Sequence, residues 1–443
     1  EEVWKGIMQR YDEMSQKYGQ EATDVAVRSS ATAEDLPDAS FAGQQETFLN
    51  IRGHQDLISA VRNCFASLFT DRAIVYRESL GYDHFQVGLS VGIQKMVRSD
   101  VGASGVAFSL DTESGFKDVV LINGSYGLGE MVVQGAVSPD EWLVFKPTLA
   151  EGYTSIIEKK LGSKDRKMVY GVEPGKPTST IPIERAQRNR FCVTDDQVLE
   201  IARSVAAIEK YYSDKKGHWC PMDVEWAIDG LTGHLFIVQA RPETIHSRKA
   251  TDRVVEYKLI NPDEATPEAP KKHPVIATGI AIGDRAGAGK VRILFSLDGR
   301  GGSGDGKDFQ QGDVLVTDMT DPDWEPIMKK ASAIITNKGG RTCHAAIVAR
   351  EMGVPAIVGC GNITDLLDTG MEVTASCCEG DTGIIYSGII PFHKEETMLA
   401  DMPETKTPIM LNVASPDLAF KFSSLPNAGV GLAREEFMAF TSN

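Results

Sequence analysis

Residues 336–351 read TNKGGRTCHAAIVARE and place His344 where a glycine-rich loop runs into a helix. The glycines at positions 339 and 340 allow the backbone to approach another group closely. Thr342 is a residue type that favours the N-cap position, and the small and apolar residues after His344 favour the helix itself. The stretch therefore predicts a strand, a loop and a helix, with Thr342 as the N-cap and His344 in the first turn.

The first turn of a helix is a favourable place for a negatively charged group. Its N–H groups have no partner within the helix, the helix dipole is positive there, and Arg341 adds a full positive charge. Imidazole is nucleophilic at neutral pH because a substantial fraction of it is unprotonated. His344 therefore fits a group that accepts a phosphoryl group and passes it on, and a helix cap or a surface histidine is the alternative.

The composition is ordinary for a globular protein, with 42% hydrophobic and 24% charged residues among 443. We find no apolar run near the roughly 20 residues that cross a bilayer. The net charge of −16 argues against a broad surface for nucleic acid or anionic membranes. The seven cysteines lack paired spacing, which argues against disulfides or zinc. We therefore expect a cytoplasmic protein that binds phosphate only at local sites.

The sequence pattern predicts three folded parts separated by two polar, proline-containing linkers. Residues 1–248 mix amphipathic helices with alternating strands, residues 275–390 show short strands between glycine-rich turns with two helices, and residues 409–443 begin like a buried strand. The linkers are residues 249–274 and 391–408, which are too polar to bury. We therefore expect a multidomain protein of the α+β or α/β class.

A hairpin is predicted near the end of the first part. Residues 223–228 and 235–239 alternate as strands, and residues 229–233 supply the turn. Glu225 and Gln239 would then lie on adjacent strands, where a carboxylate and an amide oxygen suit Mg²⁺ bound together with substrate phosphates. A solvated hairpin face is the alternative.

A second candidate site lies near the start of the chain. Residues 25–47 run from a predicted strand into a loop of small and hydroxylated residues. Arg28 can pair with phosphate through two nitrogens, and Ser29, Ser30 and the loop around Gly43 offer further donors. Ordinary turns have the same composition, so this segment alone leaves both interpretations open.

Residues 336–361, TNKGGRTCHAAIVAREMGVPAIVGCG, resemble the phosphohistidine signature of the PEP-utilising enzymes, in the form found in the phosphoenolpyruvate synthases. Residues 25–50, 124–142 and 223–244 are similar to successive elements of the ATP-grasp-like nucleotide domain of that family. Residues 409–437 resemble the entry to its PEP- and pyruvate-binding TIM barrel. The resemblance implies a nucleotide domain, a swivelling β/β/α phosphohistidine domain and the start of a TIM barrel, all within a piece of a longer chain.

The resemblance also implies a role for each candidate residue. His344 would carry the phosphoryl group, Arg341 would neutralise it, and a regulatory kinase/phosphorylase would act on Thr342. Arg434 matches an arginine that binds the substrate phosphate. The residues assigned to ATP or its metal ion are Arg28, Ser29, Ser30, Gly43, Glu225, Gln239 and Arg241.

The implied activity is that of a phosphotransferase which makes phosphoenolpyruvate from pyruvate, ATP and water, releases AMP and phosphate, and uses Mg²⁺. A gluconeogenic role and a homo-oligomer are also implied. One histidine would serve two active sites, so the predicted linkers would allow its domain to swivel. The alternatives are a related enzyme with another acceptor, of the pyruvate phosphate dikinase, rifampin phosphotransferase or glucan, water dikinase type, and a non-catalytic fragment.

Overall fold

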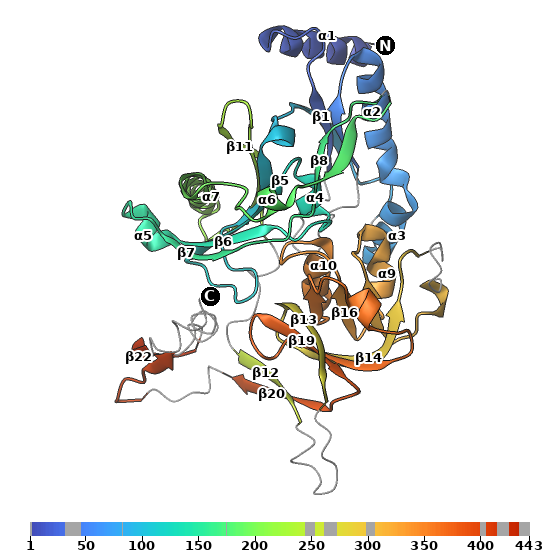
Figure 1. Ribbon diagram of the computed structural model, residues 1–443. Coiled ribbons are helices and arrows are strands. Elements are labelled where there is room, and N and C mark those ends of the chain that lie inside the picture. Colours follow the sequence, from blue (N-terminus) through green and yellow to red (C-terminus); the bar gives the residue numbers. More distant parts are fainter. Residues whose placement is uncertain are drawn as a thin grey trace, which may run out of the picture.

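The chain folds into a sheet-rich N-terminal part above a smaller barrel, with helices and strands in both (Figure 1). The mixed α and β content of the prediction is therefore confirmed. No helix among the described residues is both long and apolar enough to cross a membrane. The structure, a computed structural model, describes residues 2–31, 46–81, 83–173, 175–243, 253–260, 273–297, 306–398, 405–413 and 425–433.

The N-terminal part contains two larger antiparallel sheets. One has the strand order β2-β1-β3 and the other the order β11-β10-β4-β5-β6-β7, while β8 and β9 form a separate pair. Its elements are α1 (Glu2–Lys17), β1 (Val25–Ala31), β2 (Thr47–Ile51), α2 (His54–Ala66), η1 (Ser67–Phe69), α3 (Asp71–Leu80), β3 (Leu89–Lys95), η2 (Ser99–Val101), β4 (Ala103–Phe108), β5 (Val119–Tyr126), α4 (Glu130–Val133), β6 (Asp140–Phe145), α5 (Lys146–Ala150), β7 (Ile156–Lys160), β8 (Arg166–Tyr170), β9 (Thr178–Pro182), α6 (Arg185–Arg188), α7 (Asp195–Lys216), β10 (Met222–Ile228) and β11 (Leu235–Pro242).

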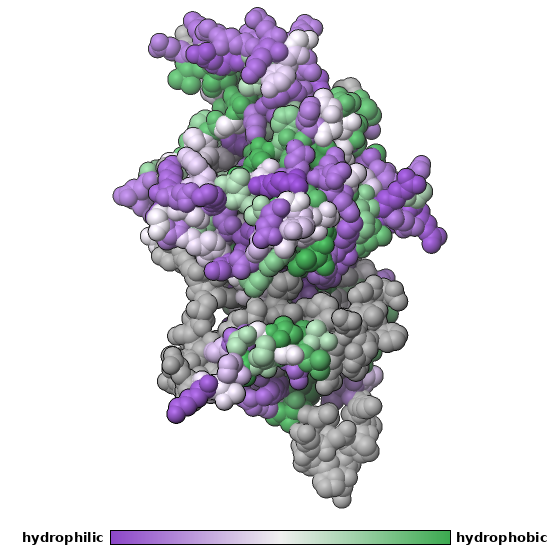
Figure 2. Space-filling model, turned by 90° about the vertical axis from the view of Figure 1, so that its left-hand side faces the viewer, coloured by the Kyte–Doolittle hydropathy of each residue, from purple (hydrophilic) through white to green (hydrophobic). Residues whose placement is uncertain are grey.

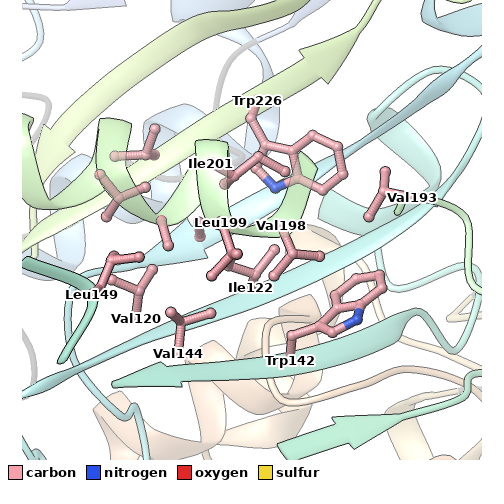
Figure 3. Close-up of a cluster of buried hydrophobic side chains, with 14 of the residues drawn as sticks. Val120, Ile122, Trp142, Val144, Leu149, Val193, Val198, Leu199, Ile201 and Trp226 are labelled. Atoms are coloured by element: carbon pink, nitrogen blue, oxygen red, sulfur yellow. The ribbon is translucent and has the colours of Figure 1, made fainter. Parts of the chain in front are cut away.

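Helix α7 covers one face of the six-stranded sheet. It begins with a capping box, in which the side chains of Thr194 and Gln197 each bind the backbone N–H of the other residue. Its apolar side chains pack against Trp142 and Trp226 in a fully buried cluster (Figure 3). Because side chains alternate along a strand, the even-numbered residues of β10 face α7 and the odd-numbered residues, including Glu225, face the opposite side.

The second part is a closed barrel with the strand order β13-β17-β16-β15-β14-β18-β19, in which β14 to β17 run parallel. Helices α9 and α10 pack on it over a second apolar cluster. The remaining elements are β12 (Arg253–Leu259), β13 (Val275–Ile282), β14 (Ala286–Ile293), η4 (Gly306–Asp308), β15 (Val314–Thr317), η5 (Pro322–Trp324), α9 (Glu325–Met328), β16 (Ala333–Thr336), α10 (His344–Met352), β17 (Ala356–Val358), α11 (Ile363–Leu366), β18 (Glu372–Ser376), β19 (Thr382–Ser387), β20 (Phe392–Met398), β21 (Leu411–Val413) and β22 (Val430–Ala433).

The two segments predicted as linkers each contribute a strand to one antiparallel ribbon. β12 pairs with β20 from Arg253 opposite Met398 to Leu259 opposite Phe392. Charged residues made both segments look like free linkers. In the ribbon, however, the backbone groups pair with one another, and cross-strand pairs such as Lys258 with Glu395 hold opposite charges together.

Near the end of the described chain, β21 and β22 form a parallel pair. The strand predicted at the start of residues 409–443 is therefore present, but it is not buried along its length, because Leu411 is only half-buried and Asn412 is exposed. Large apolar side chains on and beside this pair are exposed, and Figure 2, which faces this side, shows hydrophobic residues gathered there. They are Ile409, Met410, Val430 and Leu432.

Candidate active site

His344 is the first residue of α10, at the carboxyl ends of the parallel barrel strands. A loop from β16 leads into the helix, and Thr320 follows β15, the neighbouring strand. Because parallel strands end at one edge of a sheet, these two residues meet: Thr320 Oγ1 lies 2.9 Å from His344 Nδ1. The predicted place of His344 in the first helical turn is confirmed.

The prediction that Thr342 is the N-cap is wrong. Cys343 occupies the N-cap position, and α10 has no side-chain cap. The Thr342 hydroxyl instead donates to Asn123 Oδ1 on β5 of the N-terminal part, at 3.1 Å, and the residue is only 3% exposed. A hydrogen bond to a distant segment has displaced the local capping bond.

The surroundings of His344 keep its imidazole neutral. Burial lowers the pKa of His344 to about 4, so the ring carries one proton at neutral pH. A neutral imidazole has one N–H group and one lone pair. When Nδ1–H donates to the Thr320 hydroxyl, the lone pair lies on Nε2, which becomes the nucleophilic nitrogen. Sequence reasoning missed Thr320, whose only signal is its place after the strand next to β16.

The loop that carries His344 rests against the N-terminal part, directly beneath its sheet (Figure 1). A Cβ atom on Gly135 would lie 2.3 Å from Cys343 Cβ, and one on Gly340 would lie 3.0 Å from Pro139 Cδ. The first of these distances is shorter than any normal contact, so the absence of a side chain at Gly135 allows the two backbones to approach. The histidine therefore lies at the interface between the two parts.

Arg341 lies in this interface and is surrounded by carboxylates. Its guanidinium is 2.7 Å from Asp381 of the barrel, 3.5 Å from Glu141 and 3.7 Å from Asp111, the last two from the N-terminal part. Burial opposes its charge, but the neighbouring carboxylates, Glu141 first, raise its pKa well above the ordinary value. In this arrangement the guanidinium of Arg341 is paired with carboxylates.

The predicted hairpin is present, with Glu225 on β10 directly opposite Gln239 on β11. Arg28, on β1 of the other sheet, donates from Nη2 to Glu225 Oε2 at 2.8 Å and also to Gln239 Oε1. The side-chain oxygens of Glu225 and Gln239 thus converge on one cationic nitrogen. Two such oxygens that converge on one point would also suit Mg²⁺. The described residues contain no group of three His, Cys, Asp or Glu residues that could hold a metal ion, so a metal here would also need phosphate oxygens.

The pair two residues further along the hairpin, on the same face, extends this cluster. Arg241 lies opposite Asp223, and its Nε donates to Asp223 Oδ2 at 2.8 Å. Burial, and then the charge of Glu225, raise the pKa of Glu130 on α4. Sequence reasoning missed both acids, because Asp223 looked like an ordinary strand residue and Glu130 like part of a glycine-rich turn. The result is a cationic and acidic cluster between the two sheets of the N-terminal part.

The remaining candidates are less close to this cluster or lie outside the described residues. Strand alternation puts Ser29 on the face of β1 opposite to Arg28, whereas Ser30 shares the face of Arg28 and is exposed. Gly43 and Arg434 both lie outside the described residues.

Comparisons with known proteins identify the family of each of the two parts. Residues 1–259 match the family described as pyruvate phosphate dikinase, AMP/ATP-binding domain, and residues 309–380 match the PEP-utilising enzyme, mobile domain. The chain is 57% identical to phosphoenolpyruvate synthase of Aquifex aeolicus, over 98% of this chain and 49% of that protein. It is 53% identical to the protein of the same name from Synechocystis, over 98% and 51% of the two chains.

A third relative, phosphoenolpyruvate synthase of Escherichia coli, is 51% identical over 99% of this chain and 52% of its own length. The chain therefore spans about half the length of the curated relatives it matches. The resemblance read from the histidine motif is confirmed: this chain belongs to the family of the pyruvate phosphate dikinase AMP/ATP-binding domain, and it also carries the PEP-utilising mobile domain around His344.

Proposed function

We propose that the protein is a phosphoenolpyruvate synthase in which ATP phosphorylates His344 and the phosphohistidine then phosphorylates pyruvate. The observation that carries this proposal is a neutral imidazole at the start of α10, at the interface with the part that matches an AMP/ATP-binding domain. The names of relatives at 51–57% identity give the same reaction.

The first step is attack of His344 Nε2 on the β-phosphorus of ATP, which breaks the bond to the oxygen bridging the α-phosphate and releases AMP. Water then removes the terminal phosphate, and the remaining phosphoryl group passes to the enolate oxygen of pyruvate. Thr320 would hold the ring in the tautomer that leaves Nε2 free, which is supported by its 2.9 Å distance from Nδ1.

Arg28, Glu225, Gln239 and Arg241 would bind ATP and its metal ion, with further contacts from Ser29, Ser30 and Gly43. Mg²⁺ would be held by Glu225 and Gln239, and when bound it would offset the negative charge of the phosphates. The pairing of Arg28 with the same two oxygens supports this assignment, because Arg28 could exchange these partners for a phosphate.

The wider organisation is proposed on the same grounds. Residues 1–248 would be the ATP-grasp-like domain, residues 275–390 the swivelling phosphohistidine domain, and residues 409–443, with Arg434 as a ligand of the substrate phosphate, the start of a TIM barrel. Segments 249–274 and 391–408 would connect them, as the description of residues 309–380 as a mobile domain supports. A cytoplasmic homo-oligomer fits these substrates, and sedimentation would test the oligomeric state.

Arg341 would neutralise the phosphoryl group on His344 once it exchanges its carboxylate partners for phosphate. Thr342 would be the target of a regulatory kinase and phosphorylase. Since its hydroxyl is buried against Asn123, such a regulator would have to act when the barrel has left the N-terminal part. Replacing Thr342 with Val should abolish this inhibition, and continued silencing of the variant by the regulator would contradict the assignment.

The central test is incubation with Mg²⁺ and ATP labelled at the β-phosphate. We expect acid-labile, alkali-stable label on His344 of the wild type and none on His344→Ala. Label that survives in His344→Ala, or a full-length wild-type protein that takes up no label, would contradict the proposal.

A further inference from the structure

A single carboxylate of the N-terminal part contacts two separate segments of the barrel. Glu113 lies between β4 and β5, and it forms an ion pair with Nη2 of Arg350 on α10. Its Oε2 also accepts a hydrogen bond from the backbone N–H of Gly283, in the turn between β13 and β14, at 3.0 Å. The side chains of Glu113 and Arg350 are only 15% and 5% exposed, so this contact is largely shielded from water.

Arg350 transmits this contact to the segment that carries His344. It lies on the same helix, six residues further on, and its Nη1 donates to the carbonyl oxygen of Arg341, in the loop before the helix. One guanidinium therefore ties the loop, the helix and Glu113 together. A displacement of Glu113 would therefore move both the loop before His344 and the helix after it.

The charges favour this arrangement. Burial acts against the Glu113 carboxylate, but Arg350 and then Arg341 hold its pKa below the ordinary value, so it is ionised. Arg350 Nε is buried and has no hydrogen-bond partner among the described residues. The guanidinium thus depends on Glu113 for a counter-charge within hydrogen-bond distance.

The other charged contacts from this loop to the N-terminal part are longer. Arg341 reaches Glu141 at 3.5 Å and Asp111 at 3.7 Å, and its close partner, Asp381, belongs to its own domain. Lys160 of the N-terminal part is 3.6 Å from Asp381. Among the charged contacts between the two parts in the described residues, the closest is therefore that of Glu113 with Arg350, and the neutral hydrogen bond of Thr342 to Asn123 lies beside it.

We propose that Glu113 is a positioning residue for phosphoryl transfer: through Arg350 and Gly283 it docks the barrel on the N-terminal part and sets the direction of α10. This inference rests on the proposed function for its catalytic consequence. The docking itself can be measured without ATP.

Cys343 reports docking, because it is buried and its Cβ faces Gly135 across the interface. We would compare its alkylation by iodoacetamide in the wild type and in Glu113→Gln, reading each cysteine by mass spectrometry. Loss of one charge-assisted hydrogen bond at a buried site should speed the reaction of Cys343 by at least about tenfold. Cys220 and Cys377, buried within the two separate cores, should react at unchanged rates.

Glu200→Gln, on the exposed side of α7, is the matched control and should leave Cys343 protected. Equal rates at Cys343 in the wild type and Glu113→Gln would overturn the proposal. If Cys343, Cys220 and Cys377 all react faster in Glu113→Gln, the charge-swapped double variant Glu113→Arg with Arg350→Glu decides. Slow alkylation of Cys343 in the double variant would support the docking pair, and fast alkylation would refute it.

The catalytic consequence has its own readout. At saturating ATP, Glu113→Gln should label His344 at least about tenfold more slowly, with an unchanged dissociation constant for ATP, because Glu113 is not among the nucleotide-site residues. Weakened ATP binding with a normal rate would refute a positioning role. A wild type that takes up no label contradicts the proposed function, whereas the alkylation result still decides the docking pair.

Discussion

The ion pair between Lys164 and Asp140 is completely buried, with both side chains 0% exposed. Asp140 Oδ1 also accepts the N–H of Gly162 at 2.9 Å, and Oδ2 accepts the N–H of Cys192 at 2.8 Å. Asp140→Asn removes the charge and turns an amide NH₂ group towards one of these donors. Because Lys164 then loses its counter-charge and keeps only neutral oxygen atoms, such as the carbonyl of Gly162, as partners, we expect the free energy of unfolding to fall by about 3–5 kcal/mol.

Urea denaturation followed by tryptophan fluorescence measures this loss, since Trp142 and Trp226 are buried in the same sheet as Asp140. The protein has several folded parts, so the transition of the N-terminal part should be fitted separately. The matched control is Asp214→Asn, which removes an exposed ion pair on α7 and should leave the midpoint unchanged.

A double variant separates the buried charge from other effects of the substitution. Asp140→Asn combined with Lys164→Met leaves no uncompensated ammonium group, so it should recover at least about half of the lost stability. A loss below about 1 kcal/mol in the single variant, or a double variant no more stable than the single one, would refute this reasoning.

Three further predictions concern the two sites. Thr320→Val should slow labelling of His344 about tenfold in single-turnover assays, because Nδ1 loses its partner, while ATP binding stays unchanged. The pKa of His344 in the folded protein, about 4, lies below the ordinary 6.5, so the neutral ring contributes to stability fully above pH 6.5, and this contribution is lost as the pH falls towards 4. Since the residue is partly exposed, we expect this pH-dependent loss of unfolding free energy to be about 1–2 kcal/mol. The variant His344→Gln should lack this loss in acid-denaturation curves. Arg28→Met should weaken ATP binding at least about tenfold by calorimetry, and an unchanged affinity would contradict its place in the nucleotide site.

Local patterns predicted the local parts of both sites. The hairpin that pairs Glu225 with Gln239 and the helix that begins at His344 follow from alternation, turn residues and helix-forming residues over short segments. Arg28 and Glu225 are 197 residues apart in the sequence, and a local periodicity cannot predict a contact between residues so far apart. The family resemblance, rather than the pattern, grouped these residues.

What the sequence left out depends on tertiary contacts. Thr320 is one hydroxyl residue in a loop, and only the parallel order of β15 and β16 brings it to His344. Thr342 looked like a cap, because the rule for caps considers only the local backbone and Asn123 lies in another part of the chain. The pairing of β12 with β20 was missed for the same reason, since charge and proline content predict exposure but not a partner strand.

The ribbon of β12 and β20 would restrict the proposed swivelling of the barrel relative to the N-terminal part. Strand β12 precedes the barrel in the sequence and β20 follows it, and together they form one two-stranded ribbon of seven residues per strand, roughly 23 Å long. Because the two strands are paired along their whole length, the proposed swivelling of the barrel would have to move both of them together. An insertion in one strand alone would shift the register of this ribbon and thereby change the orientation of the barrel relative to the N-terminal part.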